Sequence, residues 1–158
     1  MRGFTLPVWV AAAAQSAAHM LSGNDFESEQ RIDFPNDDQS IVVNVRSASV
    51  VDRCKKSIGI CNCDPGECLD ITSNLEIWTC LEYVAIDENS NLALSSDESW
   101  LKIVPGYGVG KSSLTNDISI SEFARQLLWF NLDTFRKKGH YLKLEIIFPS
   151  GKQLATKT

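Results

Sequence analysis

An alanine-rich stretch near the start, "LPVWVAAAAQSAAHML" at residues 6–21, most constrains how this chain can fold. Pro7 suits the first turn of a helix, where its missing N–H leaves no hydrogen bond unmade, and Thr5 lies just upstream as a capping hydroxyl. Alanine side chains let another element approach closely but each contributes little apolar area. We therefore predict a helix over residues 7–22 whose alanine face lies against a sheet or a ligand.

The same stretch could also be a secretory signal, because an Arg after the initiator Met, an apolar run and Ala-x-Ala spacings are typical of one. Pro7 would then lie inside the apolar region, and Gln15 and His19 interrupt its continuation. The chain also has an odd number of cysteines, five, and no Asn-x-Ser/Thr acceptor site. Both features favour a reducing compartment, and hence a mature helix.

Length and charge limit the classes of partner. With 158 residues the chain is one domain, or one domain and part of a second. Its formal net charge of -5 argues against nucleic acid or an anionic membrane surface as a partner, because those ligands need a basic face. No apolar run reaches the roughly 18 residues that could span a bilayer. A soluble domain that binds neither is expected.

Alternating apolar residues predict a sheet built from hairpins. A hairpin is predicted over 32–45 around Pro35, with further strands at 58–61, 76–86, 100–104 and 142–148. The tail "QLATKT" begins a return strand that stops short, which would leave the edge beside 142–148 unpaired. We therefore expect a chain cut short.

A second helix is predicted over about 120–138. Ser119 and Glu122 form a capping box, and Gly139 ends the helix. The apolar face is predicted from helical spacing to contain Ile120, Phe123, Leu127 and Phe130. The predicted fold class is α+β, with helices packed on a mixed or antiparallel sheet.

A polar cluster precedes the strand at 76–86. Asp64, Asp70 and Thr72 lie in "DPGECLDITSN", where such residues either bond their own backbone in turns or grip a small ligand. The cysteines in and around this segment (Cys54, Cys61, Cys63, Cys68 and Cys80) lack the second Cys pair of a zinc site, and we assign no metal.

A glycine-rich turn, "PGYGVGKSS", follows the strand at 100–104. Pro105 occupies the position at which a phosphate-binding Walker loop needs glycine, and Gly106, Gly108 and Gly110 lack the spacing of a dinucleotide fingerprint. A tight turn that lets the backbone approach a neighbour or a ligand is predicted instead.

Four segments, taken in order, resemble the CbiD family, the cobalt-precorrin-5B C(1)-methyltransferases of anaerobic cobalamin (vitamin B12) biosynthesis. They are "GFTLPVWVAAAAQSAA" at 3–18, "CDPGECLDITSNLEIW" at 63–78, "PGYGVGK" at 105–111 and "LEIIFPSGKQLATKT" at 144–158. Leu6 and Pro7 replace the Thr and Gly of the commoner family opening, and 66–69 split the family's Asp-Pro and Asp-x-Thr elements. The family continues past "LATKT" into a second, glycine-rich α/β domain.

This resemblance implies that residues 1–158 are the N-terminal α+β domain of a CbiD-like protein, with the final hairpin incomplete and the C-terminal domain absent. It further implies a cytoplasmic enzyme that transfers a methyl group from S-adenosylmethionine to C-1 of a tetrapyrrole, with cobalt only as part of the substrate. In the resembling proteins the opening segment is mature sequence, so the secretory-signal interpretation is set aside.

The resemblance also indicates which residues would bind substrate or cofactor, without assigning a general base or an oligomeric state. These are Thr5, Asp64, Asp70, Thr72, Gly106, Gly108, Gly110 and Lys111. Two alternatives stay open: a truncated, non-catalytic fragment that at most binds tetrapyrrole or a partner, and an unrelated small α+β binding domain.

Overall fold

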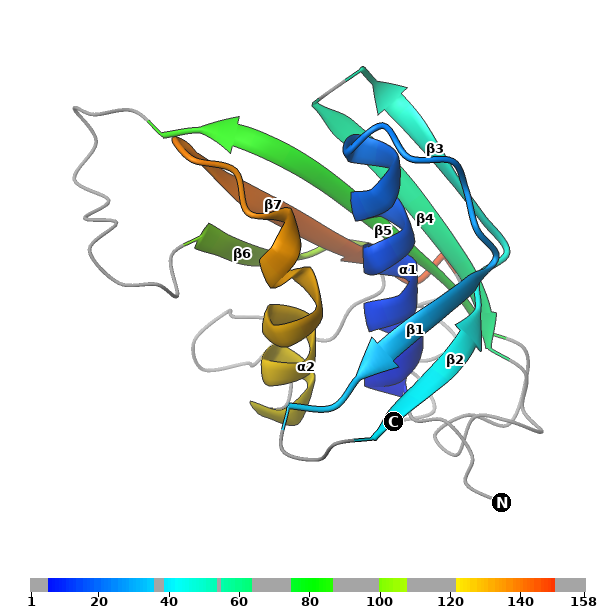
Figure 1. The fold of residues 1–158 in the computed structure, drawn as a ribbon. Coiled ribbons are helices and arrows are strands. Elements are labelled where there is room, and N and C mark those ends of the chain that lie inside the picture. The colour runs from blue at the N-terminus through cyan, green and yellow to red at the C-terminus, as the bar shows by residue number, and fades with distance from the viewer. Residues whose placement is uncertain are drawn as a thin grey trace.

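The computed structural model describes residues 6–35, 39–53, 55–63, 75–86, 100–107 and 122–149. The elements are α1 (Leu6–Leu21), β1 (Glu29–Asp33), β2 (Ser40–Asn44), β3 (Ser47–Asp52), β4 (Lys56–Cys63), β5 (Leu75–Ala85), β6 (Leu101–Pro105), α2 (Glu122–Leu132), the short 3-10 helix η2 (Asp133–Phe135) and β7 (His140–Ile147). Both helices lie on the same side of the large sheet (Figure 1). The predicted α+β class is confirmed.

The large sheet has five strands in the order β3-β4-β5-β7-β6. All neighbours are antiparallel except β6 and β7, which run parallel, so the sheet is mixed. The predicted hairpin over 32–45 is present as β1 and β2, but these strands form a separate two-stranded sheet. β3 was not predicted from the sequence.

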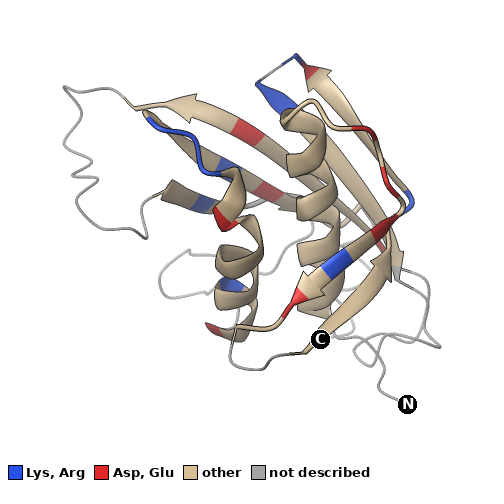
Figure 2. Ribbon diagram, in the orientation of Figure 1, with Lys and Arg blue, Asp and Glu red and all other residues tan. Residues whose placement is uncertain are grey.

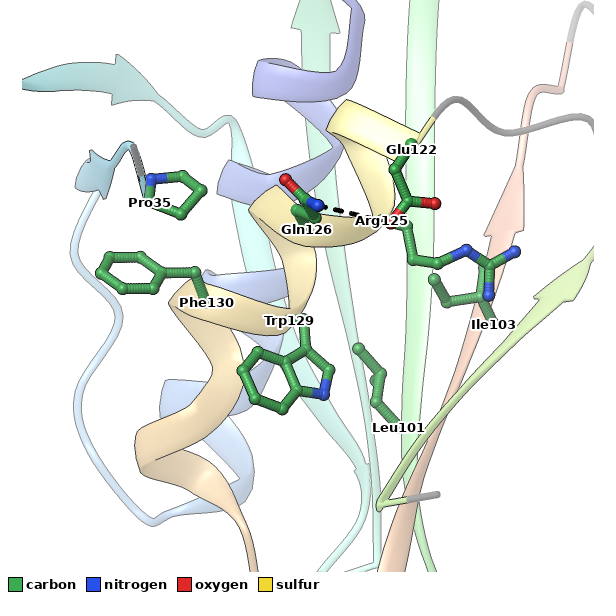
Figure 3. A pocket seen from close by; sticks show the side chains of 8 residues that line it. All are labelled: Pro35, Leu101, Ile103, Glu122, Arg125, Gln126, Trp129 and Phe130. Carbon is green, nitrogen blue, oxygen red and sulfur yellow. Dashed lines mark hydrogen bonds between the residues drawn. The ribbon is translucent and has the colours of Figure 1, made fainter. Parts of the chain in front are cut away.

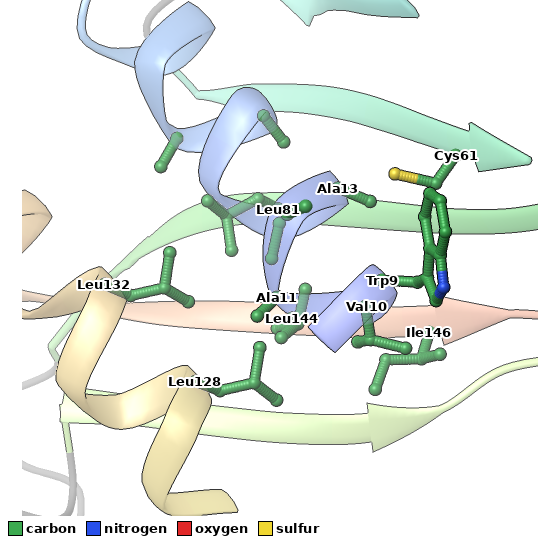
Figure 4. Close-up of a cluster of buried hydrophobic side chains, with 14 of the residues drawn as sticks. Trp9, Val10, Ala11, Ala13, Cys61, Leu81, Leu128, Leu132, Leu144 and Ile146 are labelled. Carbon is green, nitrogen blue, oxygen red and sulfur yellow. The ribbon is translucent and has the colours of Figure 1, made fainter. Parts of the chain in front are cut away.

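Helix α1 is enclosed by several elements. It contacts β3, β4 and β5 on one side, the β1–β2 hairpin on another, and α2 along its flank (Figure 1). It carries no Lys, Arg, Asp or Glu (Figure 2). Its small residues, Ala11 to Ala14 with Ala17 and Ala18, are all 0% exposed. The alanines therefore serve close packing on several elements at once, which explains why a helix with so little apolar side chain is the centre of the core (Figure 4).

The tightest contact is between α1 and β4. A Cβ atom added to Gly59 would lie 2.7 Å from the Ser16 Oγ and closer still to the Ala13 carbonyl oxygen, so only glycine fits. Beside it, the buried Ser57 hydroxyl donates a hydrogen bond to the Ala17 carbonyl at 2.6 Å. The predicted close approach of the alanine face to a sheet is confirmed.

The expected unpaired edge beside 142–148 is wrong. β7 lies between β5 and β6, and Leu144 is in register with Leu81 on one side and Ile103 on the other. A parallel partner from a distant segment fills the place that sequence reasoning gave to a hairpin return strand. That return strand, at 153–158, lies outside the described residues.

Helix α2 ends earlier than predicted and buries a different face. It ends at Leu132 and continues as η2, and its buried residues are Ala124, Leu127, Leu128, Asn131 and Leu132. Leu127 is in the core as predicted, whereas Phe123 and Phe130 are 43% and 45% exposed. Contacts with neighbouring elements determine which face of α2 is buried. α2 packs on α1, and the Asn131 side chain hydrogen-bonds to both the N–H and the C=O of Asp33 in β1 at 2.9 Å. Ser119 and Ile120 lie outside the described residues.

Candidate functional site

Of the eight residues predicted to bind ligand, the structure describes only Gly106. The other seven lie outside the described residues: Thr5, Asp64, Asp70, Thr72, Gly108, Gly110 and Lys111. Their roles stay predictions. The described residues that flank them can nevertheless be located.

Those flanking residues meet at one end of the large sheet. β4 ends at Cys63 opposite the start of β5 at Leu75, and the two are paired in register. β6 ends at Pro105, which is level with Ile146 near the end of β7. The start of β5 is also level with the end of β7, because Trp78 is in register with Ile147.

Helix α1 begins at the same end. Ser57 contacts Ala17, and further along β4 Gly59 faces Ala13 and Ser16, so α1 and β4 run in opposite directions. The start of α1 therefore lies near the end of β4, and Figure 4 shows Trp9 beside Cys61 there. Three predicted ligand segments thus adjoin described residues that share one end of the domain.

Gly106 is explained by chain packing. Its N–H donates a hydrogen bond to the Ile146 carbonyl at 2.8 Å. An added Cβ would lie 2.6 Å from that oxygen and 2.7 Å from the Ile147 Cγ1, so a side chain has no room. The predicted tight approach to a neighbour is confirmed, and the neighbour is β7. Because this N–H already pairs within the fold, it is not free to bind a ligand.

A pocket of about 530 Å³ lies between α2, β6 and the turn after β1 (Figure 3). We call it the α2–β6 pocket. Its lining is one stripe of α2, two residues of β6 and one proline: Glu122, Arg125, Gln126, Trp129, Phe130, Leu101, Ile103 and Pro35. The α2 residues recur at helical spacing, so they share one face of the helix.

The pocket has a polar end and an apolar end. Glu122, Arg125 and Gln126 lie toward the start of α2, and the Gln126 amide donates to the Glu122 carboxylate at 3.4 Å. Trp129 and Leu101 lie together farther along (Figure 3). A charged end with both signs and an aromatic end are complementary to a ligand that is itself polar at one end.

Contacts behind the lining hold the pocket's shape. The Trp129 ring packs on Trp100 with centroids 5.8 Å apart, and the Arg136 guanidinium lies 5.2 Å from the Trp100 ring centre. Next to the pocket, Phe34 stacks on Phe123 at 6.3 Å. Sequence reasoning missed this pocket: the stripe on α2 is readable from its spacing, but its pairing with β6 is not.

The described thiols are poor candidates for chemistry. Burial raises the pKa of Cys61 to about 12, and burial followed by the Glu145 charge raises the pKa of Cys80. Thiolates are the form that binds metals and attacks electrophiles, so both side chains are inert near neutral pH. Among the described residues, no group of three His, Cys, Asp or Glu side chains is placed to hold a metal. Within the same residues, neither helix has the length and hydropathy needed to cross a bilayer.

Known proteins resemble this chain along its whole length. The CbiD family profile matches residues 1–158. The chain is 60% identical over 162 residues to the cobalt-precorrin-5B C(1)-methyltransferase of Prochlorococcus marinus strain SARG, and 42% identical over 162 residues to the protein of that name from strain NATL2A. Each alignment covers 100% of this chain and 42% of the relative. The chain therefore spans well under half the length of these relatives.

One solved structure has the same fold. It is a cobalamin biosynthesis protein (cbiD) from Archaeoglobus fulgidus, with a TM-score of 0.59 and 17% sequence identity. The match covers 99% of this chain and 46% of that one. At this identity the likeness concerns the fold alone.

Proposed function

The chain belongs to the CbiD family, and from that premise we propose that it supplies the N-terminal portion of a methyltransferase that acts on a cobalt-bearing tetrapyrrole. The reaction would transfer a methyl group from S-adenosylmethionine to C-1 of cobalt-precorrin-5B and give cobalt-precorrin-6A. The observation that carries the proposal is the 60% identity, along the whole chain, to a relative with that named activity. The odd number of cysteines supports a cytoplasmic location.

The geometry supports a role in binding and orientation. Methyl transfer from a sulfonium needs the methyl group held in line with an electron-rich carbon and shielded from water, and it needs little covalent help from the protein. The shared end of the sheet, where β4 and β6 finish and α1 begins, is where the predicted ligand segments attach. We place the tetrapyrrole contacts there.

Roles for the predicted residues follow from their chemistry. The tetrapyrrole carries several carboxylates, which N–H groups and cations bind. The turn with Gly108 and Gly110, together with Lys111, would supply those groups, and Thr5 would present a helix start. Asp64, Asp70 and Thr72 would orient the substrate by hydrogen bonds. No general base is assigned.

A fusion protein tests this proposal. The chain replaces the matching 162-residue portion of the strain SARG relative, and the fusion is incubated with cobalt-precorrin-5B and S-adenosylmethionine. We expect a product heavier by one added methyl group, with the intact relative as positive control and the relative without this portion as negative control.

The result also separates the two candidate roles. A folded fusion that binds the tetrapyrrole but yields no methylated product would contradict the enzymatic role and favour a fragment that only binds. Asp70→Ala in the active fusion should lower turnover, and unchanged turnover would remove Asp70 from the site.

A further inference from the structure

We propose that the α2–β6 pocket is the binding site for S-adenosylmethionine, a ligand that joins an amino-acid zwitterion to an aromatic ring through a sulfonium. This inference rests on the proposed methyltransferase function, because that function requires such a donor. It separates two places in the domain: the methyl donor would bind between α2 and β6, and the tetrapyrrole at the shared end of the sheet.

The size of the pocket favours the donor over the tetrapyrrole. Its volume is about 530 Å³, in the lower half of the roughly 300–1,000 Å³ that small-molecule sites span. A nucleoside carrying an amino acid fits within that volume. A macrocycle of four linked pyrrole rings with its acid side chains is much larger, and only one edge of it could enter.

The charges at the polar end favour the same ligand. Glu122 and Arg125 lie one helical turn apart on the same face of α2, and both line the pocket. A carboxylate and a guanidinium side by side match the α-ammonium and α-carboxylate of an amino acid, and Arg binds a carboxylate through two parallel hydrogen bonds. A tetrapyrrole that carries only acid groups would be repelled by Glu122.

The apolar end suits the remaining parts of the donor. Trp129 offers an aromatic face beside Leu101 of β6, and Phe130 adds aromatic surface beside Pro35, whereas Ile103 lies by Arg125 near the polar end (Figure 3). Aromatic rings stack on such side chains, and a sulfonium cation is attracted to the face of an aromatic ring. Trp129 is held from behind by Trp100. The order along the pocket, zwitterion site and then aromatic surface, follows the order of groups in the ligand.

Two ligands and three variants test this site. The 158-residue chain is titrated by calorimetry with S-adenosylmethionine and with 5′-methylthioadenosine, which has the nucleoside but no amino acid. Arg125→Gln and Glu122→Gln each remove one charge from the polar end. Lys102→Gln is the matched control, because Lys102 is exposed on β6 and alternates away from the pocket-lining Leu101 and Ile103.

We expect Arg125→Gln and Glu122→Gln each to weaken S-adenosylmethionine binding by roughly five- to tenfold, the effect of losing one partly exposed charge-assisted contact. Their affinity for 5′-methylthioadenosine should stay within about twofold of the unmodified chain, since that ligand lacks the groups they contact. Lys102→Gln should bind both ligands as the unmodified chain does. A change that only disturbed the fold would weaken both ligands together.

Three results would overturn the proposal. They are absence of S-adenosylmethionine binding by the unmodified chain, equal S-adenosylmethionine affinity in all variants, and equal weakening of both ligands. The fusion assay separates this failure from that of the proposed function. If the fusion is active and Arg125→Gln leaves its KM for S-adenosylmethionine unchanged, the proposed function stands and the proposed pocket is wrong. If the fusion is inactive but the chain shows the expected binding pattern, the pocket stands and the proposed function is wrong.

Discussion

The contact between β4 and α1 gives a sharp prediction for Gly59→Ala. The added methyl group would overlap the Ala13 carbonyl oxygen and lie 2.7 Å from the Ser16 Oγ and 3.1 Å from the Ala13 carbonyl carbon. Two of these three atoms belong to the backbone of α1, so no side-chain rotation relieves the overlap. α1 is also enclosed by the β1–β2 hairpin and α2, so it has little room to shift.

The expected loss of stability follows from these contacts. Overpacking a well-packed core costs about 1–3 kcal/mol, and a backbone neighbour that cannot move puts Gly59→Ala at the upper end. Alanine also restricts the unfolded chain, which offsets about 0.4–1 kcal/mol. The net destabilisation is therefore about 2–2.6 kcal/mol, or roughly 4–10 °C in Tm for a domain of this size.

Urea and thermal unfolding, followed by circular dichroism and tryptophan fluorescence, measure this loss. Gly23→Ala is the matched control, because Gly23 has φ +83° but nothing within 4 Å of an added Cβ. Its left-handed backbone should cost about 1 kcal/mol. A free energy of unfolding for Gly59→Ala that equals or exceeds that of Gly23→Ala would refute the steric argument.

Two further predictions concern buried polar atoms. Asn131→Ala removes two hydrogen bonds to Asp33 and leaves its main-chain N–H and C=O without that partner. We expect the free energy of unfolding in urea to fall by about 2 kcal/mol. A fall of less than about 0.5 kcal/mol would contradict a stabilising role for these two hydrogen bonds. Burial raises the pKa of Cys61 from 9.0 to about 12, so the unfolded chain releases this proton first as the pH rises. The contribution of this thiol to the free energy of unfolding is fully present below pH 9 and is lost as the pH rises from 9 to about 12. Cys61→Ser should flatten the pH dependence of the unfolding free energy over the lower part of that window, and an unchanged slope would contradict the assignment.

Local patterns in the sequence were sufficient to predict most of the secondary structure. Alternation in "YLKLEIIF" predicts β7, and the run from Pro7 to the turn at Gly23 predicts α1. The pattern does not predict β3, because "SASVVD" has little apolar alternation and most of its residues are exposed. A strand at a sheet edge needs only one face and one neighbour, so its sequence carries a weak signal.

The arrangement of the site depended on contacts that no local pattern contains. α2 could present Phe123 and Phe130 or Leu128 and Asn131 to the core with equally good helical spacing, and the partners α1 and β1 decided between them. That choice turned Phe130 outward, where it lines the α2–β6 pocket beside Trp129.

Propensity, periodicity and side-chain size act over a few residues, so most of the helices and strands, and the close packing of the first helix, follow from the order of the residues alone. Contacts between distant segments place β7 inside the sheet and bring residues 35, 101–103 and 122–130 around one pocket. Strand pairing and pocket formation join segments far apart in the chain, and their free energy depends on which surfaces meet.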